Sequence, residues 1–169
     1  MRIILSWFGV LCCAFAIALG QEATPEAVGV EMVAFVVLEV RQDDGSTVES
    51  FVEAESVFPG QVIEYRLVAT NRSGGELPAG RLTLVGPIPE PTLYVAESAS
   101  PSGPEWRLEA SLDGESFAEP PLLVVETDAE GREVEVEADP GDYRALRWVV
   151  LRPLQPDEEI VLRYRVVVR

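Results

Sequence analysis

The segment from Phe58 to Asn71, which reads FPGQVIEYRLVATN, limits most strongly what this chain can fold into. It opens with the turn pair Pro59-Gly60, and an apolar set of residues then alternates with a polar set. The apolar set is Ile63, Tyr65, Leu67 and Ala69, and the polar set is Glu64, Arg66 and Thr70. A period of two between turn signals is typical of an antiparallel strand with one buried face. We therefore expect a strand whose apolar set faces a core.

Segments of the same kind recur along the rest of the chain, separated by turns rich in Asp, Gly and Pro. They predict strands at residues 30–40, 48–56, 81–85, 92–99, 106–112, 117–126, 132–138, 143–151 and 158–168. Regularly spaced short strands without a helical period indicate an all-β sandwich or barrel. We expect residues 30–169 to form one antiparallel β-sandwich domain of about nine strands.

Alternation within these strands predicts which side chains form the core. Trp106 and Trp148 fall on inward positions and are expected to be core anchors, with sugar stacking as the alternative role. The final strand is expected to direct five residues inward: Ile160, Leu162, Tyr164, Val166 and Val168. Residues 30–40 form a nearly continuous apolar run, which predicts a strand buried on both faces.

The first twenty residues have the features of a secretory signal peptide. Met1-Arg2 is positive, an apolar run extends from Ile3 to Leu19, and Ala18 and Gly20 are small residues before a cleavage point at Gln21. We expect a signal helix over residues 1–20 and a polar linker over residues 21–29. The alternative is retention as a membrane anchor, because this run is at the short end of the roughly 17–25 residues that span a bilayer.

Cleavage would remove both cysteines, Cys12 and Cys13, and leave 149 residues without a thiol. A domain of this size buries about 68–70% of its unfolded surface and can be stable without disulfides.

Charge and missing residue types exclude several functions. The thirteen basic residues are all arginine and face 29 acidic residues, so the net charge is −16. Such a surface repels nucleic acid and anionic lipid, so we expect neither as a partner. The chain has no histidine and no lysine, which excludes Ser-His-Asp catalysis, histidine-ligated zinc and lysine Schiff bases. Carboxylates, hydroxyls and arginines are what remains for catalysis.

Three acidic turns supply candidate ligands for calcium, which binds carboxylate and carbonyl oxygens. The candidates are Asp43, Asp44, Asp113, Asp139 and Asp142. Asp and Gly are also ordinary turn residues, and Asp43-Asp44-Gly45-Ser46 predicts a hairpin turn. No other cofactor is expected.

Two further polar features have competing interpretations. The row Glu133, Glu135 and Glu137 alternates with inward Val134 and Val136. We expect it to pair with arginines of a neighbouring strand, either Arg163 and Arg165 or Arg144 and Arg147, or else to protect a sheet edge from other chains. Asn71-Arg72-Ser73 is a glycosylation sequence, but Asn71 before Gly74-Gly75 is interpreted as a turn residue.

The prolines Pro87, Pro89 and Pro91 occupy alternate positions. Proline cannot donate to a strand ladder, so this segment is expected to be an edge strand or a crossover between sheets.

The order of these features resembles the bacterial conserved-repeat surface domain, domain of unknown function 11. The residues that carry the resemblance are PGQVIEYRLVATNRSGG, LTLVGPIPEPTLYVAESAS, SLDGESF and LRWVVLRPLQPDEEIVLRYRVVV, within residues 58–169. The resemblance implies an immunoglobulin-like sandwich in an exported or envelope protein. It supplies no catalytic residues. Members often occur in tandem, whereas this chain holds one copy.

These observations predict an exported, non-enzymatic β-sandwich, secreted or at the cell envelope, with a structural or protein-interaction role and a protein partner. A calcium- or carbohydrate-binding accessory module is the alternative. A carboxylate-based hydrolase is a third candidate, but among 29 acidic residues some pair will by chance meet the 5–9.5 Å spacing that a glycosidase needs.

Overall fold

The computed structural model describes residues 27–169, so the signal segment and most of the expected linker lie outside the described residues. Ten strands and one short 3-10 helix follow one another along this part of the chain. Their bounds are β1 Val28–Arg41, β2 Thr47–Glu53, β3 Val62–Asn71, β4 Thr83–Pro87, β5 Thr92–Tyr94, β6 Trp106–Ser111, β7 Leu123–Thr127, β8 Glu133–Glu137, η1 Pro140–Asp142, β9 Ala145–Val150 and β10 Glu159–Val168.

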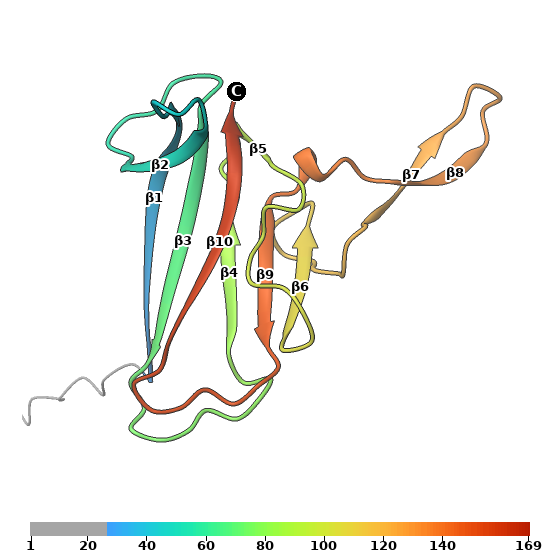
Figure 1. Ribbon diagram of the computed structural model, residues 1–169. Helices are drawn as coiled ribbons and strands as arrows, with labels where there is room; N and C mark the ends of the chain where they lie inside the picture. The colour runs from blue at the N-terminus through green and yellow to red at the C-terminus, as the bar shows by residue number, and fades with distance from the viewer. Residues whose placement is uncertain (1–26) are drawn as a thin grey trace, which may run out of the picture.

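The described part is all-β and consists of open antiparallel sheets. A five-stranded sheet has the order β2-β1-β3-β10-β5, a three-stranded sheet has the order β4-β9-β6, and β7 and β8 form a separate hairpin (Figure 1). The two larger sheets pack on each other in a sandwich-like arrangement around one core. Between residues 27 and 169, no helix has the length and apolar character needed to cross a membrane.

Tyr164 of β10 is the central contact between the two sheets. Its ring stacks on Tyr65 of β3 with centroids 5.2 Å apart and tilts against Trp148 of β9 at 6.0 Å. Its hydroxyl donates to the carbonyl of Pro87, the last residue of β4, over 2.5 Å. A Cβ atom added at Gly86 would lie 2.6 Å from the Tyr164 ring, so glycine permits this close approach.

The alternation predicted for the central strands is confirmed. Ile63, Leu67 and Ala69 are buried, and the five inward residues of β10 are each at most 9% exposed. Trp148 is fully buried, as expected. Trp106, the first residue of β6, is only half-buried, and the guanidinium of Arg152 lies over its ring. The strand expected at 92–99 is limited to Thr92–Tyr94.

The proline-rich segment is a crossover, as predicted. β4 pairs only with β9 and is therefore an edge strand of the three-stranded sheet. The next strand, β5, pairs with β10 at the edge of the five-stranded sheet. The chain thus moves from one layer to the other across Pro89 and Pro91.

The prediction that residues 30–40 are buried on both faces is wrong. Val36 is the one buried residue of β1, and the strand begins at Val28, within the expected linker. The register pairs Val30 with Ala69 and Met32 with Leu67, so these β1 residues share the core-facing side of the sheet. They are nevertheless 53% and 47% exposed, because the three-stranded sheet does not extend over β1.

The uncovered surface continues onto the β1–β2 hairpin. The register places Val40 opposite Val48 and Val36 opposite Val52, so this face is apolar along both strands. We call it the open face, and its exposed members are Val30, Met32, Leu38, Val40, Val48 and Val52.

The hairpin of β7 and β8, residues 123–137, is here called the arm, and it projects from the side of the molecule beyond β6 (Figure 1). Val134 and Val136 were expected to face inward, but Val134 is 37% exposed and Val136 is only half-buried, because the arm has no layer of its own to cover it. The expected arginine pairing of the glutamate row is also wrong. The register places Thr127, Val125 and Leu123 opposite the three glutamates. None of the three glutamates forms an ion pair within residues 27–169.

Replacing Gly86 with alanine tests the contact between the layers. The new methyl group would press on the rings of Tyr164 and Trp148, which are both fully buried and cannot move away freely. We expect the free energy of unfolding to fall by about 1–3 kcal/mol in a urea titration.

The matched control is Gly75→Ala, since nothing lies within 4 Å of a Cβ atom at that glycine. Its effect should stay within about 0.5 kcal/mol, as for other surface substitutions. Equal effects of the two substitutions would contradict the assigned role of Gly86.

Candidate functional site

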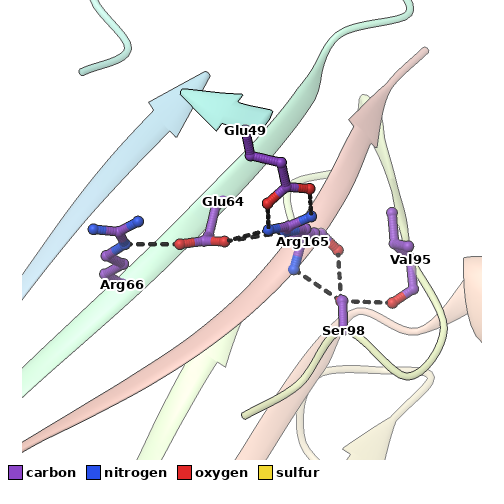
Figure 2. A network of polar contacts seen from close by, with 6 residues as sticks. All are labelled: Glu49, Glu64, Arg66, Val95, Ser98 and Arg165. Carbon is purple, nitrogen blue, oxygen red and sulfur yellow. Dashed lines mark hydrogen bonds and ion pairs between the residues drawn. The ribbon is translucent and has the colours of Figure 1, made fainter. Parts of the chain in front are cut away.

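The strongest concentration of charged groups lies on the outer face of the five-stranded sheet, around Glu64 of β3. This residue was expected to face solvent, but it is only 3% exposed. Its carboxylate accepts hydrogen bonds from Arg66 Nε over 2.7 Å and from Arg165 Nε over 3.0 Å. Arg165 also donates to both carboxylate oxygens of Glu49, over 2.7 and 2.6 Å. Figure 2 shows these four residues in one chain of contacts, which we call the Glu64 network.

Three strands position this network. Glu64 and Arg66 are two residues apart on β3 and so share its outer face, and Arg165 of β10 is the direct register partner of Glu64. Glu49 approaches from the edge strand β2. The hydroxyl of Ser98 accepts from the backbone N–H of Arg165 over 2.9 Å and donates to the carbonyl of Val95 over 2.6 Å (Figure 2).

Aromatic rings cover the same network. The guanidinium of Arg66 lies 4.5 Å from the ring centroid of Phe35 and 4.6 Å from that of Phe51. A cation over an aromatic face is attracted to it, and the rings also shield the ion pair from water. The hydrogen bonds to Glu49 raise the pKa of Arg165 above its usual value, and the same bonds lower the pKa of Glu49.

The outer face of the three-stranded sheet carries a second cluster of the same design, around Glu109 of β6. Glu109 is 8% exposed and pairs with Arg107 over 3.1 Å and with its register partner Arg147 of β9. The guanidinium of Arg147 lies 4.2 Å from the ring centroid of Phe117. Each sheet thus has on its outer face a buried glutamate held between two arginines and shielded by phenylalanine.

These clusters are suited to holding strands together. Both oxygens of Glu64 and both oxygens of Glu109 already accept hydrogen bonds from arginine. A general acid or a nucleophile needs an oxygen directed at a substrate, and these oxygens are directed at guanidinium groups. The arrangement is therefore that of a charged network that joins β2, β3 and β10 on one sheet and β6 and β9 on the other.

The sequence contained a signal for both clusters. Glu64-Tyr65-Arg66 and Arg107-Leu108-Glu109 each place opposite charges two residues apart, on one face of a strand. The third member of each cluster comes from a strand far away in the sequence, and only the strand register identifies it.

The five candidate calcium ligands lie in three separate turns. Asp44 accepts from the backbone N–H of Ser46, Asp113 from those of Glu115 and Ser116, and Asp139 from that of Gly141. Asp43 shares the turn of Asp44, and Asp142 ends the 3-10 helix that Asp139 caps. Within residues 27–169 no three carboxylate side chains gather in a way that could hold a metal ion.

Asn71 is also a structural turn residue, as predicted. It is completely buried, its amide nitrogen donates to the carbonyls of Gly75, Leu154 and Gln155, and its amide oxygen accepts from Ser73.

The structure thus defines an all-β protein with open antiparallel sheets whose two buried glutamates, Glu64 and Glu109, are engaged by arginines. Comparison with protein-family models, with curated proteins and with solved structures gave no match for this chain.

Replacing Glu64 with glutamine tests the network. The substitution leaves two arginines facing a neutral amide that cannot accept both charged hydrogen bonds equally well. Hydrogen bonds to charged groups contribute about 1.5–3 kcal/mol each, so we expect unfolding to become easier by roughly 2 kcal/mol in a denaturant titration.

The control is Glu31→Gln on β1 of the same sheet, because Glu31 is exposed and forms no ion pair within the described residues. Its effect should be within about 0.5 kcal/mol. If the two substitutions are equally mild, the network does not stabilise the fold.

Acid should destabilise the protein through several carboxylates. Hydrogen bonds lower the pKa of Glu49, Asp44, Asp113, Asp128 and Glu158 from ordinary values of 3.8 or 4.5. A lowered native pKa contributes stability above the unfolded value, and this contribution is lost as the pH falls through the native value. We expect the urea midpoint to be nearly constant from about pH 7 to 5 and to fall below the ordinary carboxylate values.

Asp113→Asn should reduce the fall of the urea midpoint at low pH. Asp113 accepts hydrogen bonds from the backbone of Ser116 and Glu115, and its pKa is lowered the most among these carboxylates. If the urea midpoint of this variant falls at low pH as steeply as that of the wild type, Asp113 does not cause the loss of stability in acid.

Proposed function

We propose that this chain is an exported, non-enzymatic β-sandwich protein with an immunoglobulin-like fold and a structural or protein-interaction role at the cell envelope. The open face is the observation that carries the interaction role. Its members include Val30, Met32 and Val52, which are 53%, 47% and 51% exposed and lie on the same face of the sheet as Leu38, Val40 and Val48. Exposed apolar side chains gathered on one face of a sheet support a role in binding another protein.

The charges support a protein partner. A net charge of −16 opposes nucleic acid and anionic lipid, and the open face carries no acidic residue among its exposed members. This apolar face suits a partner that brings an apolar surface of its own.

Two further observations support the other parts of the proposal. The buried glutamates of both outer faces are engaged by arginines, which suits a non-enzymatic role. Two antiparallel layers joined by the proline-rich crossover suit an immunoglobulin-like topology, in keeping with the resemblance in residues 58–169. Export is supported by the signal-like segment of residues 1–20.

Fractionation of cells that express the full chain tests export. We expect the protein outside the cytoplasm, with Gln21 as its first residue. Chemical cross-linking in intact cells should join it to a protein partner. An intact chain that begins at Met1 and remains in the cytoplasm would contradict the proposal.

Substitution on the open face tests the interaction role in the same cells. Val30→Lys with Met32→Lys should leave export unchanged and reduce the cross-linked fraction at least several-fold. Phe58→Lys is the control, because Phe58 is 64% exposed and lies outside the open face. Equal cross-linking of both variants would show that the open face is not the interaction surface.

A further inference from the structure

One side of β4 is free to accept another strand. Leu82 O accepts from Val150 N, and Ile88 N donates to Arg144 O, so the even-numbered residues of this segment direct their backbone groups towards β9. Backbone groups alternate between the two sides of a strand, so Thr83 and Val85 direct theirs away from β9. Within residues 27–169 no strand pairs with this side of β4. The edge therefore offers unpaired donors and acceptors for an additional strand.

A strand added at this edge would extend the smaller sheet towards the part of the open face that carries Val30 and Met32. β4 lies against Tyr164 of β10, and the five-stranded sheet continues past β10 through β3 to β1. Extending the three-stranded sheet by one strand would carry it towards β1, where Val30 and Met32 face the core side without cover. The sandwich thus lacks one strand of the smaller sheet at this position.

The arm contains a strand with the required pattern. β8 has five residues, as β4 has, and alternates Val134 and Val136 with three glutamates. This alternation is typical of a strand with one buried and one solvated face, yet among the described residues no layer covers β8, so Val134 is exposed and Val136 only half-buried. Figure 1 shows the arm on the far side of the molecule from β1, so it cannot cover the open face of its own chain.

We propose that β8 of one copy of this chain adds to the free edge of β4 of a second copy. Val134 and Val136 then lie on the open face of the second copy, and the register partner of Val134 on the same side of the arm is Glu126. Glu133, Glu135 and Glu137 lie on the outer face of the extended sheet, in solvent.

Charge favours β8 in this orientation. Arg81 is two residues before Thr83 and four before Val85, and all three are exposed. It therefore lies next to the outer face of β4. It is exposed and forms no ion pair within the described part of the chain. It can therefore face the glutamate row, which has no arginine partner within residues 27–169 of its own chain. The other face of the arm fits less well, because it would bury three acids, Glu133, Glu135 and Glu137, whereas the face of Val134 and Val136 carries one, Glu126.

The donor strand and the acceptor edge are different surfaces of the chain. Each copy can therefore donate to one neighbour and accept from another, which gives a head-to-tail series rather than a symmetric pair. One hairpin buries a small area, at the low end of specific interfaces, so the association is reversible. The repulsion between copies of charge −16 is screened over roughly 8 Å at physiological ionic strength.

The experiment uses the chain purified from cells that express the full sequence, so it does not depend on whether or where the protein is exported. Sedimentation velocity of the wild-type protein should show species that grow beyond a dimer as the concentration increases. Val85→Pro removes an edge donor and should leave a monomer, whereas Val85→Thr keeps the N–H group and should assemble. Val134→Lys with Val136→Lys should also leave a monomer, because it changes the donor strand.

The decisive measurement mixes the two defective proteins. The Val85→Pro chain still has a donor strand and the Val134→Lys, Val136→Lys chain still has an acceptor edge, so an equimolar mixture should form dimers and nothing larger. Val125→Lys is the matched control for the arm, since Val125 is 62% exposed on the face directed away from the contact, and it should assemble like the wild type. Circular dichroism should show the same strand content in every variant.

Three results would each overturn this inference. The wild-type chain could remain monomeric up to about 1 mM, which would assign the open face to a different protein. The mixture of defective variants could remain monomeric. Val125→Lys could abolish assembly as fully as the changes at Val134 and Val136.

Discussion

The contact of Tyr164 with Gly86 and Trp148 determines how the two layers lie on each other. Glycine on β4 lets that strand approach the ring of Tyr164, and the hydroxyl of Tyr164 then binds the carbonyl of Pro87. This contact fixes β4 against β10, which is two strands away from β1 in the five-stranded sheet. The smaller sheet consequently ends before it reaches β1, and the open face follows from that limit.

The outer surfaces of both layers are held by electrostatics rather than by a further layer. Glu64 and Glu109 are each enclosed by two arginines, and Phe35, Phe51 and Phe117 cover the guanidinium groups. Removing such carboxylates from water is costly, and the charged hydrogen bonds offset that cost only while both arginines stay in place. The chain thus has an apolar centre between two polar networks.

Much of the fold could be predicted from the sequence, because period-two alternation reports burial directly. It gave the inward residues of β3 and β10, the burial of Trp148, and the crossover after Pro87. It could not give the exposure of Val30 and Val134, because alternation does not say whether a second layer reaches a strand. The same limit hid Glu64, a polar residue on an outer face whose burial depends on Arg165 of a strand about a hundred positions later. The candidate calcium ligands were turn residues with local hydrogen bonds, a use that Asp and Gly share with metal loops.

The place of β10 has a consequence for the order of events when the protein is made. This strand, residues 159–168, lies between β3 and β5 in the larger sheet and supplies Tyr164 to the core. A ribosome delivers it after all the other strands described here, so the larger sheet cannot close before residues 159–168 have emerged. This late closure joins β10 to β3, strands about ninety residues apart, and the pairing of such distant segments is a slow kind of folding step.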